Sequence, residues 1–352
     1  MDVLNRKIRE LLASAVSEKI FNRAVAGYVL PNGKTQVIAR GTSEEAVFDI
    51  ASLTKVCPTS ALALKAILEE KLSLDTPVFQ WIPEFQTNFR EQVLVRHLLT
   101  HSLDYRVPMS SLKSLAPPAI LETLYRYTFL KAPGSVFNYG NPASILLGIL
   151  LSRLYREPVS DLGRDAFFKP LGMARSGWFP LARVPAGEVI PTENCPWRGR
   201  IIHGEVHDES AFVLGSLFPV GSAGMFSCVP DLLKFLRMIL RDGVFDGQRI
   251  VPAGLLSMVS APALENVPDA ACSLGFEYNA ERFMGNCKGK KRFGKTGFTG
   301  ASMVADAELS AGIVLLSDFT YPLREKNADR INAFRSALSE LFFESVGVPG
   351  SL

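Results

Sequence analysis

Strand-like segments stand at both ends of this chain, and helical segments fill the stretch between them. Residues 25–30 and 35–40 have the pattern of two strands and flank a Pro-Asn-Gly turn at 31–33, which is a strong signal for a β-hairpin. Residues 300–307 and 312–318 are apolar, strand-like and separated by a short turn. Strands at both ends with helices between them indicate one sheet built from both termini.

This order of elements predicts an α/β protein. We expect an antiparallel sheet flanked by helices, built from both termini, with an inserted mainly helical lobe. The α/β lobe would comprise residues 1–75 and 232–352, and the helical lobe residues 76–231. Two lobes suit a chain of 352 residues, since single cores rarely grow past about 250–300 residues. Apolar residues at helical spacing predict amphipathic helices over residues 1–20 and 324–343.

The composition narrows the class of protein. The net charge is +3, so the chain lacks the strong, clustered basic excess that is typical of nucleic-acid-binding proteins. The sequence shows no run of about 18 apolar residues and no recognisable export signal, so we expect a cytoplasmic protein without a transmembrane helix. The five cysteines are scattered and odd in number, which favours free thiols: Cys57, Cys195, Cys228, Cys272 and Cys287.

Ser52 and Lys55 are the first candidates for catalysis. They lie three residues apart at the predicted start of a helix, so the amine can reach the hydroxyl. Serine needs an adjacent base, and a lysine whose pKa is lowered by burial can serve. We expect Pro58 to kink this helix or to set off its first turn. The alternative is a helix-capping serine followed by an exposed lysine. A second such pair, Ser110 and Lys113, precedes two prolines and is expected in a loop.

Tyr139 and Asn141 form a second group, two residues apart on a loop before an apolar helical segment. Both side chains can point into one cleft, where tyrosine can relay protons and asparagine can bind both an amine and a substrate amide. The alternative for Tyr139 is an aromatic side chain that anchors the start of the helix.

Lys295, Thr296 and Gly297 form a third group, which precedes strand-like sequence near the C-terminus. An edge strand can pair with an extended substrate, and its backbone amides can stabilise an oxyanion. The positive charge of the lysine would favour a substrate carboxylate or a tyrosinate. On its own, this tripeptide is too common to indicate a function.

In this order and spacing, the three groups resemble the serine β-lactamase and penicillin-binding-protein superfamily, for which SxxK and KTG are characteristic. The chain looks most like the class C β-lactamase-like branch, which includes D-aminopeptidases and family VIII carboxylesterases. The resemblance runs from about residue 25 to residue 318. Four further segments support it: VRHLLTHS at 95–102, PLGM at 170–173, GEVHDESA at 204–211 and GSAGMFS at 221–227.

The resemblance implies a role for each group. Ser52 would be the acylated nucleophile, Lys55 and Tyr139 would share the general-base and general-acid roles, and Asn141 would orient the substrate amide and Lys55. The oxyanion hole would be the backbone N–H groups of Ser52 and Phe298. The substrate-binding wall opposite would comprise Lys295, Thr296, Gly297 and Phe298. Neither a metal nor another cofactor is implied.

The sequence departs from the family pattern at three places. Gly140 stands inside the YxN motif, where serine or alanine is more familiar. Leu103 and Asp104 occupy positions where the family usually has glycine. Phe298 is bulkier than the small residue typical of class C β-lactamases, which disfavours β-lactam turnover.

The predicted function is that of a serine hydrolase that acts through an acyl-enzyme on a small ester or amide, either esterase-like or peptidase-like. A true β-lactamase or a D-Ala-D-Ala carboxypeptidase is one alternative. A catalytically silent binding or scaffold member of the superfamily is an alternative of another class. The expected partner is a small-molecule ester, amide or β-lactam substrate, with neither nucleic acid nor a membrane involved, and the oligomeric state is left open.

Two patterns favour rival functions. Residues 289–296 match the P-loop pattern GxxxxGK[ST], but a P-loop needs a buried strand before it and a helix after it, and the sequence predicts neither. The basic run 288–295 contains one aromatic residue, and we interpret it as a solvated hairpin tip rather than a nucleic-acid site.

Two HxxxH pairs could bind zinc if they lay on helices: His97 with His101, and His203 with His207. Neither pair carries the HExxH base, so we expect histidines hydrogen-bonded in structural turns. Cys57 follows the SxxK motif closely, and we expect a small buried side chain there rather than a reactive thiol.

Overall fold

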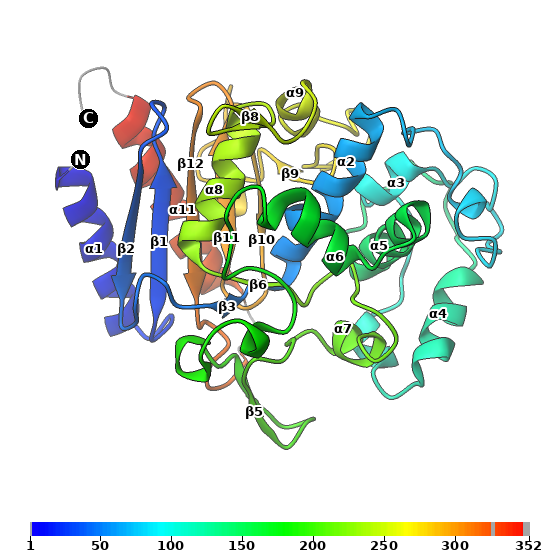
Figure 1. The fold of residues 1–352 in the computed structure, drawn as a ribbon, viewed down its shortest axis with the longest axis horizontal. Helices are drawn as coiled ribbons and strands as arrows, with labels where there is room; N and C mark the ends of the chain where they lie inside the picture. Colours follow the sequence, from blue (N-terminus) through cyan, green and yellow to red (C-terminus); the bar gives the residue numbers. More distant parts are fainter. Residues whose placement is uncertain (1, 325–327, 348–352) are drawn as a thin grey trace.

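One sheet of six antiparallel strands organises the molecule, and both ends of the chain contribute to it (Figure 1). The computed structural model describes residues 2–324 and 328–347. The order across the sheet is β2-β1-β12-β11-β10-β9. The strands are β1 Ala24–Val29, β2 Thr35–Arg40, β9 Glu277–Tyr278, β10 Arg292–Thr296, β11 Ser302–Asp306 and β12 Ala311–Ser317. The N-terminal hairpin and the antiparallel sheet built from both termini are confirmed.

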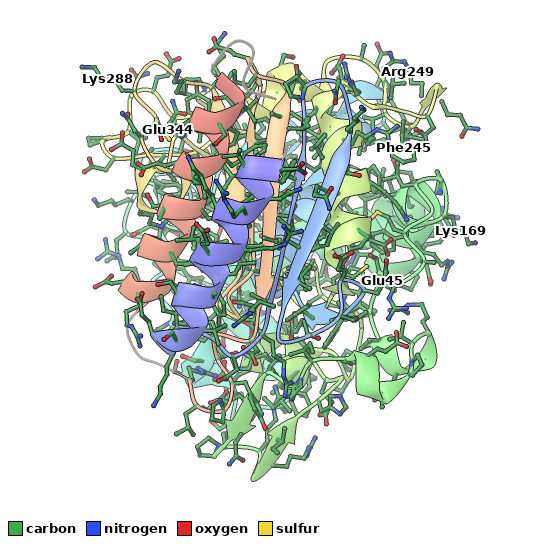
Figure 2. All side chains as sticks on the ribbon, turned by 90° about the vertical axis from the view of Figure 1, so that its left-hand side faces the viewer. Glu45, Lys169, Phe245, Arg249, Lys288 and Glu344 are labelled. Atoms are coloured by element: carbon green, nitrogen blue, oxygen red, sulfur yellow. The ribbon has the colours of Figure 1, made fainter. Side chains whose placement is uncertain are left out.

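Helices cover both faces of this sheet. Figure 2 shows α1 (Asp2–Ser17) and α11 (Asp329–Gly347) side by side on one face, where their apolar side chains join those of the strands in one core. On the opposite face α8 (Val229–Leu240) packs against β1 and β12. The last helix begins at Asp329 and not at the predicted residue 324, and a bend that contains Pro322 lies before it.

The middle of the chain forms the helical side of the molecule (Figure 1). At its centre α5 (Asn141–Tyr155) is buried over its first three turns and contacts α2, α3 and α6. The other helices on this side are α2 Ala61–Leu68, α3 Val95–Leu99, α4 Pro117–Tyr125, α6 Val159–Gly163 and α7 Glu209–Leu214. Two short helices lie elsewhere: α9 Leu255–Val259 packs against α2 and α8, and α10 Glu281–Met284 packs against α11. The predicted fold class is confirmed, while the lobe boundaries at 75/76 and 231/232 stay a prediction.

The remaining elements are short. Three strand pairs lie outside the main sheet: β3 Phe48–Asp49 with β6 Phe226–Ser227, β4 Glu193–Cys195 with β5 Arg200–Ile202, and β7 Val244–Phe245 with β8 Gln248–Arg249. The single turns of 3-10 or π helix are η1 Ala51–Lys55, η2 Val56–Ser60, η3 Val78–Gln80, η4 Met109–Leu112, η5 Arg164–Phe168, η6 Pro180–Ala182 and η7 Ala186–Glu188. The second SxxK pair, expected in a loop, begins on η4.

The predicted helix after Ser52 is divided as Pro58 suggested. The segment passes through η1 and η2 before α2 begins at Ala61. Cys57 has extended backbone angles (φ −117°, ψ 103°), because the residue before a proline is pushed out of the helical region. The first turn, which carries Ser52 and Lys55, is therefore a separate structural unit.

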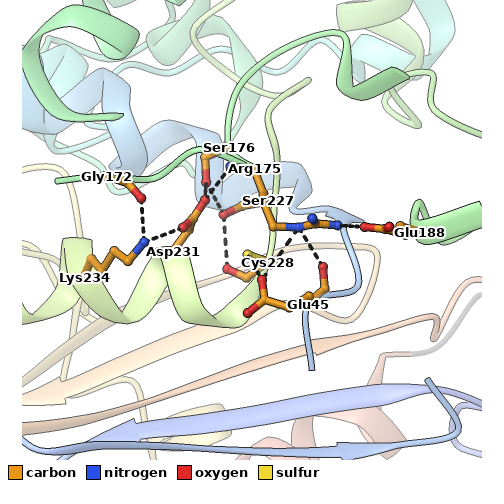
Figure 3. A network of polar contacts seen from close by, with 9 residues as sticks. All are labelled: Glu45, Gly172, Arg175, Ser176, Glu188, Ser227, Cys228, Asp231 and Lys234. Atoms are coloured by element: carbon orange, nitrogen blue, oxygen red, sulfur yellow. Dashed lines mark hydrogen bonds and ion pairs between the residues drawn. The ribbon is translucent and has the colours of Figure 1, made fainter. Parts of the chain in front are cut away.

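A buried polar network ties the loop after residue 172 to the start of α8 (Figure 3). Asp231 in the first turn of α8 accepts hydrogen bonds from the Arg175 backbone N–H and the Ser176 hydroxyl, both at 2.9 Å. Lys234 donates to Asp231 at 3.0 Å and also to the Gly172 carbonyl. Gly172 of the PLGM segment therefore lies where this network joins a loop to the core.

All five cysteines are buried and free, which confirms the prediction of free thiols and of a buried Cys57. Within the described ranges, no helix is both long enough and apolar enough to cross a membrane.

Candidate active site

Ser52 stands in the first turn of η1, directly after β3. Ala51 before it has φ +47°, a left-handed conformation that is uncommon for a residue with a Cβ. The Asp49 carboxylate accepts a hydrogen bond from the Ala51 N–H at 2.8 Å, and the Thr54 hydroxyl donates to the Ala51 carbonyl at 2.7 Å. These bonds hold the tight turn at which Ser52 lines a cleft.

Lys55 is buried below Ser52, with 1% of its surface exposed. Its Nζ lies 2.9 Å from Ser52 Oγ, 2.8 Å from Asn141 Oδ1 and 2.8 Å from the Ser222 carbonyl oxygen. Burial lowers the pKa of Lys55, nearby Tyr139 raises it again in part, and the net pKa is below that of an ordinary lysine. A neutral amine is therefore more accessible here than on the surface.

Tyr139 precedes α5 and lies over two lysines. Its ring centre is 3.5 Å from Lys295 Nζ and 5.5 Å from Lys55 Nζ, and the His101 ring meets it edge-on at 4.9 Å. Burial raises the pKa of Tyr139, but the two lysine charges and a hydrogen bond with Ser52 outweigh it, so the net pKa is lowered. The phenol is thus suited to give up and regain a proton.

Asn141 is the first residue of α5 and bridges Lys55 to the half-buried carboxylate of Asp208. Its Nδ2 donates to Asp208 Oδ2 at 2.8 Å and to Ser210 Oγ at 3.1 Å. Asp208 caps the N-terminus of α7 by accepting from the Ala211 N–H at 2.8 Å. A continuous polar chain therefore runs from Ser52 through Lys55 and Asn141 to Asp208.

Lys295 is a buried strand residue, so the interpretation of 288–295 as a solvated hairpin tip is wrong for its second half. Lys295 Nζ lies 2.8 Å from Glu277 Oε1, with both side chains buried. Arg292 pairs with buried Asp306 at 3.4 Å. Only residues 288–291 are exposed, because β10 lies between β9 and β11 with both of its faces covered.

Phe298 follows the KTG motif and is 47% exposed. Its ring is stacked on that of His207 (centroids 5.8 Å apart, planes at 19°), and Arg324 lies over it at 5.2 Å. Arg335 of α11 donates to the Gly297 carbonyl at 2.7 Å, which fixes the turn that carries the Phe298 N–H.

The predicted site residues meet in one place, although they come from three distant segments. Those that line a cleft of about 310 Å³ are Ser52, Tyr139, Thr296, Gly297 and Phe298. Tyr139 and Asn141 also line an adjoining cavity of about 450 Å³. The amines of Lys55 and Lys295 lie against the Ser52 hydroxyl and the Tyr139 ring, respectively, and both lysines are buried.

Three groups that contact the predicted site residues were not themselves predicted: Asp208 beside Asn141, Glu277 beside Lys295 and the Ser222 carbonyl beside Lys55. An aspartate just before a helical segment is an N-cap signal, so Asp208 could have been placed at the start of a helix. That signal does not indicate contact with Asn141. The sequence carries no signal for Glu277, because the pairing of β9 with β10 that buries Lys295 beside it is not encoded locally.

The histidines do not gather into a metal site. His97 Nδ1 accepts a hydrogen bond from a backbone N–H at 3.1 Å, and His203 Nε2 contacts two backbone carbonyls at 3.0 and 2.9 Å. His207 Nε2 lies 2.7 Å from Glu193. Over residues 2–324 and 328–347, no group of three or more His, Cys, Asp or Glu side chains could hold a metal ion.

The P-loop-like pattern at 289–296 does not have the structure of a P-loop. Its second half is strand β10, which continues through a turn into β11. The helix whose N-terminal amides would bind phosphate is therefore replaced by a strand.

Comparison with known proteins agrees with this geometry. The family model described as Beta-lactamase matches residues 8–338, which is nearly the whole chain. The chain belongs to the Beta-lactamase family. The predicted resemblance to serine β-lactamases and penicillin-binding proteins is confirmed, and so is the prediction of a serine hydrolase.

Individual relatives are distant. The proposed D-alanyl-D-alanine carboxypeptidase of Escherichia coli K12 is 27% identical over 303 residues, which covers 77% of this chain and 69% of that protein. The N-acetylmuramyl-L-alanine amidase of Bacillus subtilis is 24% identical over 335 residues, with 85% and 74% covered.

Solved structures share the fold at still lower identity. EstCE1, a hydrolase with promiscuous acyltransferase activity, superposes with a TM-score of 0.71 at 20% identity, over 95% of this chain and 98% of that one. The β-lactamase/D-alanine carboxypeptidase of Pseudomonas syringae gives 0.74 at 18% identity, over 97% and 99%.

Proposed function

We propose that this protein hydrolyses a small ester or amide through an acyl-enzyme at Ser52, with Lys55 and Tyr139 transferring the proton. The observation that carries the proposal is the set of three partners around Lys55 Nζ. Two of them, the Asn141 side-chain oxygen and the Ser222 carbonyl, can only accept hydrogen bonds. A neutral amine that donates its two N–H bonds to them has its lone pair directed at the Ser52 hydroxyl.

In acylation, Ser52 Oγ attacks the carbonyl carbon of the substrate while Lys55 takes the hydroxyl proton. The tetrahedral oxyanion accepts hydrogen bonds from the backbone N–H groups of Ser52 and Phe298. Tyr139 protonates the leaving alkoxide or amine as the scissile bond breaks, and Lys55 returns its proton to Tyr139. The two residues therefore titrate as a coupled pair.

In deacylation, a water molecule takes the place of the leaving group. The Lys55 and Tyr139 pair removes one of its protons as its oxygen attacks the acyl carbon, and Ser52 Oγ regains a proton as it leaves. The products are the free acid and the starting enzyme.

The walls of the cleft favour an apolar group on the substrate. Phe298, Phe319 and Ile331 line the side next to the proposed oxyanion hole. A volume of about 310 Å³ lies at the lower end of the range for small-molecule sites, which is about 300–1,000 Å³. These features support a small ester more than a long peptide. Carboxylesterase activity and a cytoplasmic location stay predictions.

A side-by-side rate assay tests the proposal. We expect turnover of p-nitrophenyl acetate that falls at least about 10³-fold in Ser52→Ala, with much slower cleavage of a chromogenic cephalosporin and of a D-Ala-D-Ala peptide. Wild-type activity in Ser52→Ala would reject the nucleophile. Preferred cleavage of the cephalosporin or of the peptide would replace the esterase with the corresponding alternative, and no turnover of any substrate would favour a silent binding protein.

A further inference from the structure

The Asn141 amide is held at both ends, so its two orientations are not equivalent. Its oxygen faces Lys55 and its nitrogen faces Asp208, each at 2.8 Å. Ser210 donates its own hydroxyl proton to the second Asp208 oxygen at 2.6 Å, which leaves the Ser210 oxygen to accept from Asn141. Because a carboxylate only accepts, this network permits one amide orientation.

We propose that Asp208 is a positioning residue that directs the Lys55 lone pair at Ser52 by fixing the orientation of the Asn141 amide. The proposal rests on the proposed function and adds a residue to it. If the amide were reversed, its NH₂ group would face Lys55, and a neutral amine would accept from it through its lone pair. The lone pair would then no longer face Ser52, although every residue of the motifs would still be present.

Asp208 is well placed to enforce this orientation. It is fixed as the N-cap of α7, and the His207 N–H directly before it donates to Asp49 at 2.7 Å. Asp49 is the same carboxylate that holds Ala51 beside the nucleophile. Burial raises the pKa of Asp208, but its hydrogen bonds and the Lys55 charge outweigh burial, so the net pKa is lowered and the carboxylate remains an acceptor.

Removing the Asp208 charge has a second effect, which distinguishes an action on Lys55 from a general weakening of the fold. The charge raises the pKa of Lys55, so Asp208→Asn lowers that pKa and moves the acid limb of the pH–rate profile to lower pH. The Asn141 amide, which is then no longer held in one orientation, meanwhile lowers the plateau of the profile. A variant that only weakened the fold would lower the plateau without moving the limb.

The experiment measures the rate at which a fluorophosphonate probe labels Ser52, together with kcat/KM for p-nitrophenyl acetate from pH 5 to pH 10. We expect Asp208→Asn to lower both plateaus about 10–100-fold and to shift the acid limb downward. The matched control is Glu205→Gln, the same change on the same segment at a solvent-accessible carboxylate paired with Arg200, and it should match the wild type.

Two further variants separate positioning from folding. Asp208→Ser keeps a helix cap for α7, but its hydroxyl can donate or accept, so we expect a loss similar to that of Asp208→Asn. Asn141→Ala combined with Asp208→Asn should be no slower than Asn141→Ala alone, because Asp208 acts through Asn141. Labelling at the wild-type rate in Asp208→Asn, or additive losses in the double variant, would overturn the proposal.

The probe also separates this inference from the proposed function. If the wild type labels at Ser52 but hydrolyses no ester, the proposed function fails, and the labelling rates still decide the role of Asp208. If Ser52 does not label in the wild type, both proposals are wrong.

Discussion

The two walls of the cleft differ in the side chains beside the substrate: one wall carries a hydrogen-bonded network and the other an exposed aromatic ring. On the nucleophile wall, Lys55 is buried and Asp208 is half-buried, and Asn141 links the two by hydrogen bonds. On the opposite wall, Lys295 is likewise buried and paired with Glu277, but Phe298 is 47% exposed and contacts the His207 ring and the Arg324 guanidinium. The first wall is suited to one chemical step, and the second can vary with the substrate.

This contrast predicts a gradient of mutational effects. Removing one partner of a buried charged network leaves the other partner unsatisfied in a low-dielectric interior, which is costly. Removing an exposed ring loses contact area and leaves few polar groups unsatisfied. Substitutions in the buried network of the nucleophile wall should therefore reduce activity on every substrate, whereas substitution of the exposed Phe298 ring on the opposite wall should change preference.

Lys55→Met should have the largest effect of the substitutions that test this contrast. Methionine fills similar space but removes the base for Ser52, so we expect kcat/KM for p-nitrophenyl acetate to fall about 10³-fold at pH 8, with a similar loss on every substrate. Steady-state kinetics measures this. The matched control is Lys65→Met in α2, a lysine paired with Glu69, which should leave the rate within about threefold. Less than a tenfold loss in Lys55→Met would assign the base elsewhere.

Tyr139→Phe should have an intermediate effect. The ring and its packing on His101 remain, but the acid for the leaving group is lost, so we expect a loss of about 10–100-fold. Because Tyr139 raises the pKa of Lys55, its removal should move the acid limb of kcat/KM to lower pH. A profile from pH 5 to pH 10 measures both, with Tyr155→Phe at the far end of α5 as the control. Loss of the acid limb altogether would make Tyr139 the base.

The difference between the walls also explains what the sequence could and could not predict. Ser52 and Lys55 were predictable because they are three residues apart on one turn, where spacing alone brings them together. The N-terminal hairpin was also predictable from local sequence, because a short turn joins its two strands. The role of Asp208 was not predictable, because its partner Asn141 lies 67 positions away and no local pattern encodes that contact.

The error at Lys295 has a related cause. Five Lys and Arg residues between 288 and 295 suggest an exposed tip, and sequence gives no sign that Glu277 and Asp306 neutralise two of them inside the sheet. A charge run is therefore ambiguous until the pairing of strands is known. The same limit applies to Phe298, whose motif predicts the position of its N–H but not the neighbours of its ring.

Phe298→Ala should have the smallest effect on simple esters and the largest on preference. The proposed oxyanion donor at this position is a backbone N–H that alanine retains, so kcat/KM for p-nitrophenyl acetate should stay within about threefold. Apolar contact with larger acyl groups is lost and space opens beside Ser52. We therefore expect KM for p-nitrophenyl butyrate to rise several-fold and the cephalosporin-to-acetate rate ratio to increase.

Parallel assays of the three substrates measure this, with Phe179→Ala as the control because that ring is 67% exposed and does not line the cleft. A uniform loss on all three substrates would show that Phe298 supports the oxyanion turn itself. The two walls would then act as one catalytic unit, and the determinant of substrate preference would have to be sought in the adjoining cavity lined by Tyr105 and Met109.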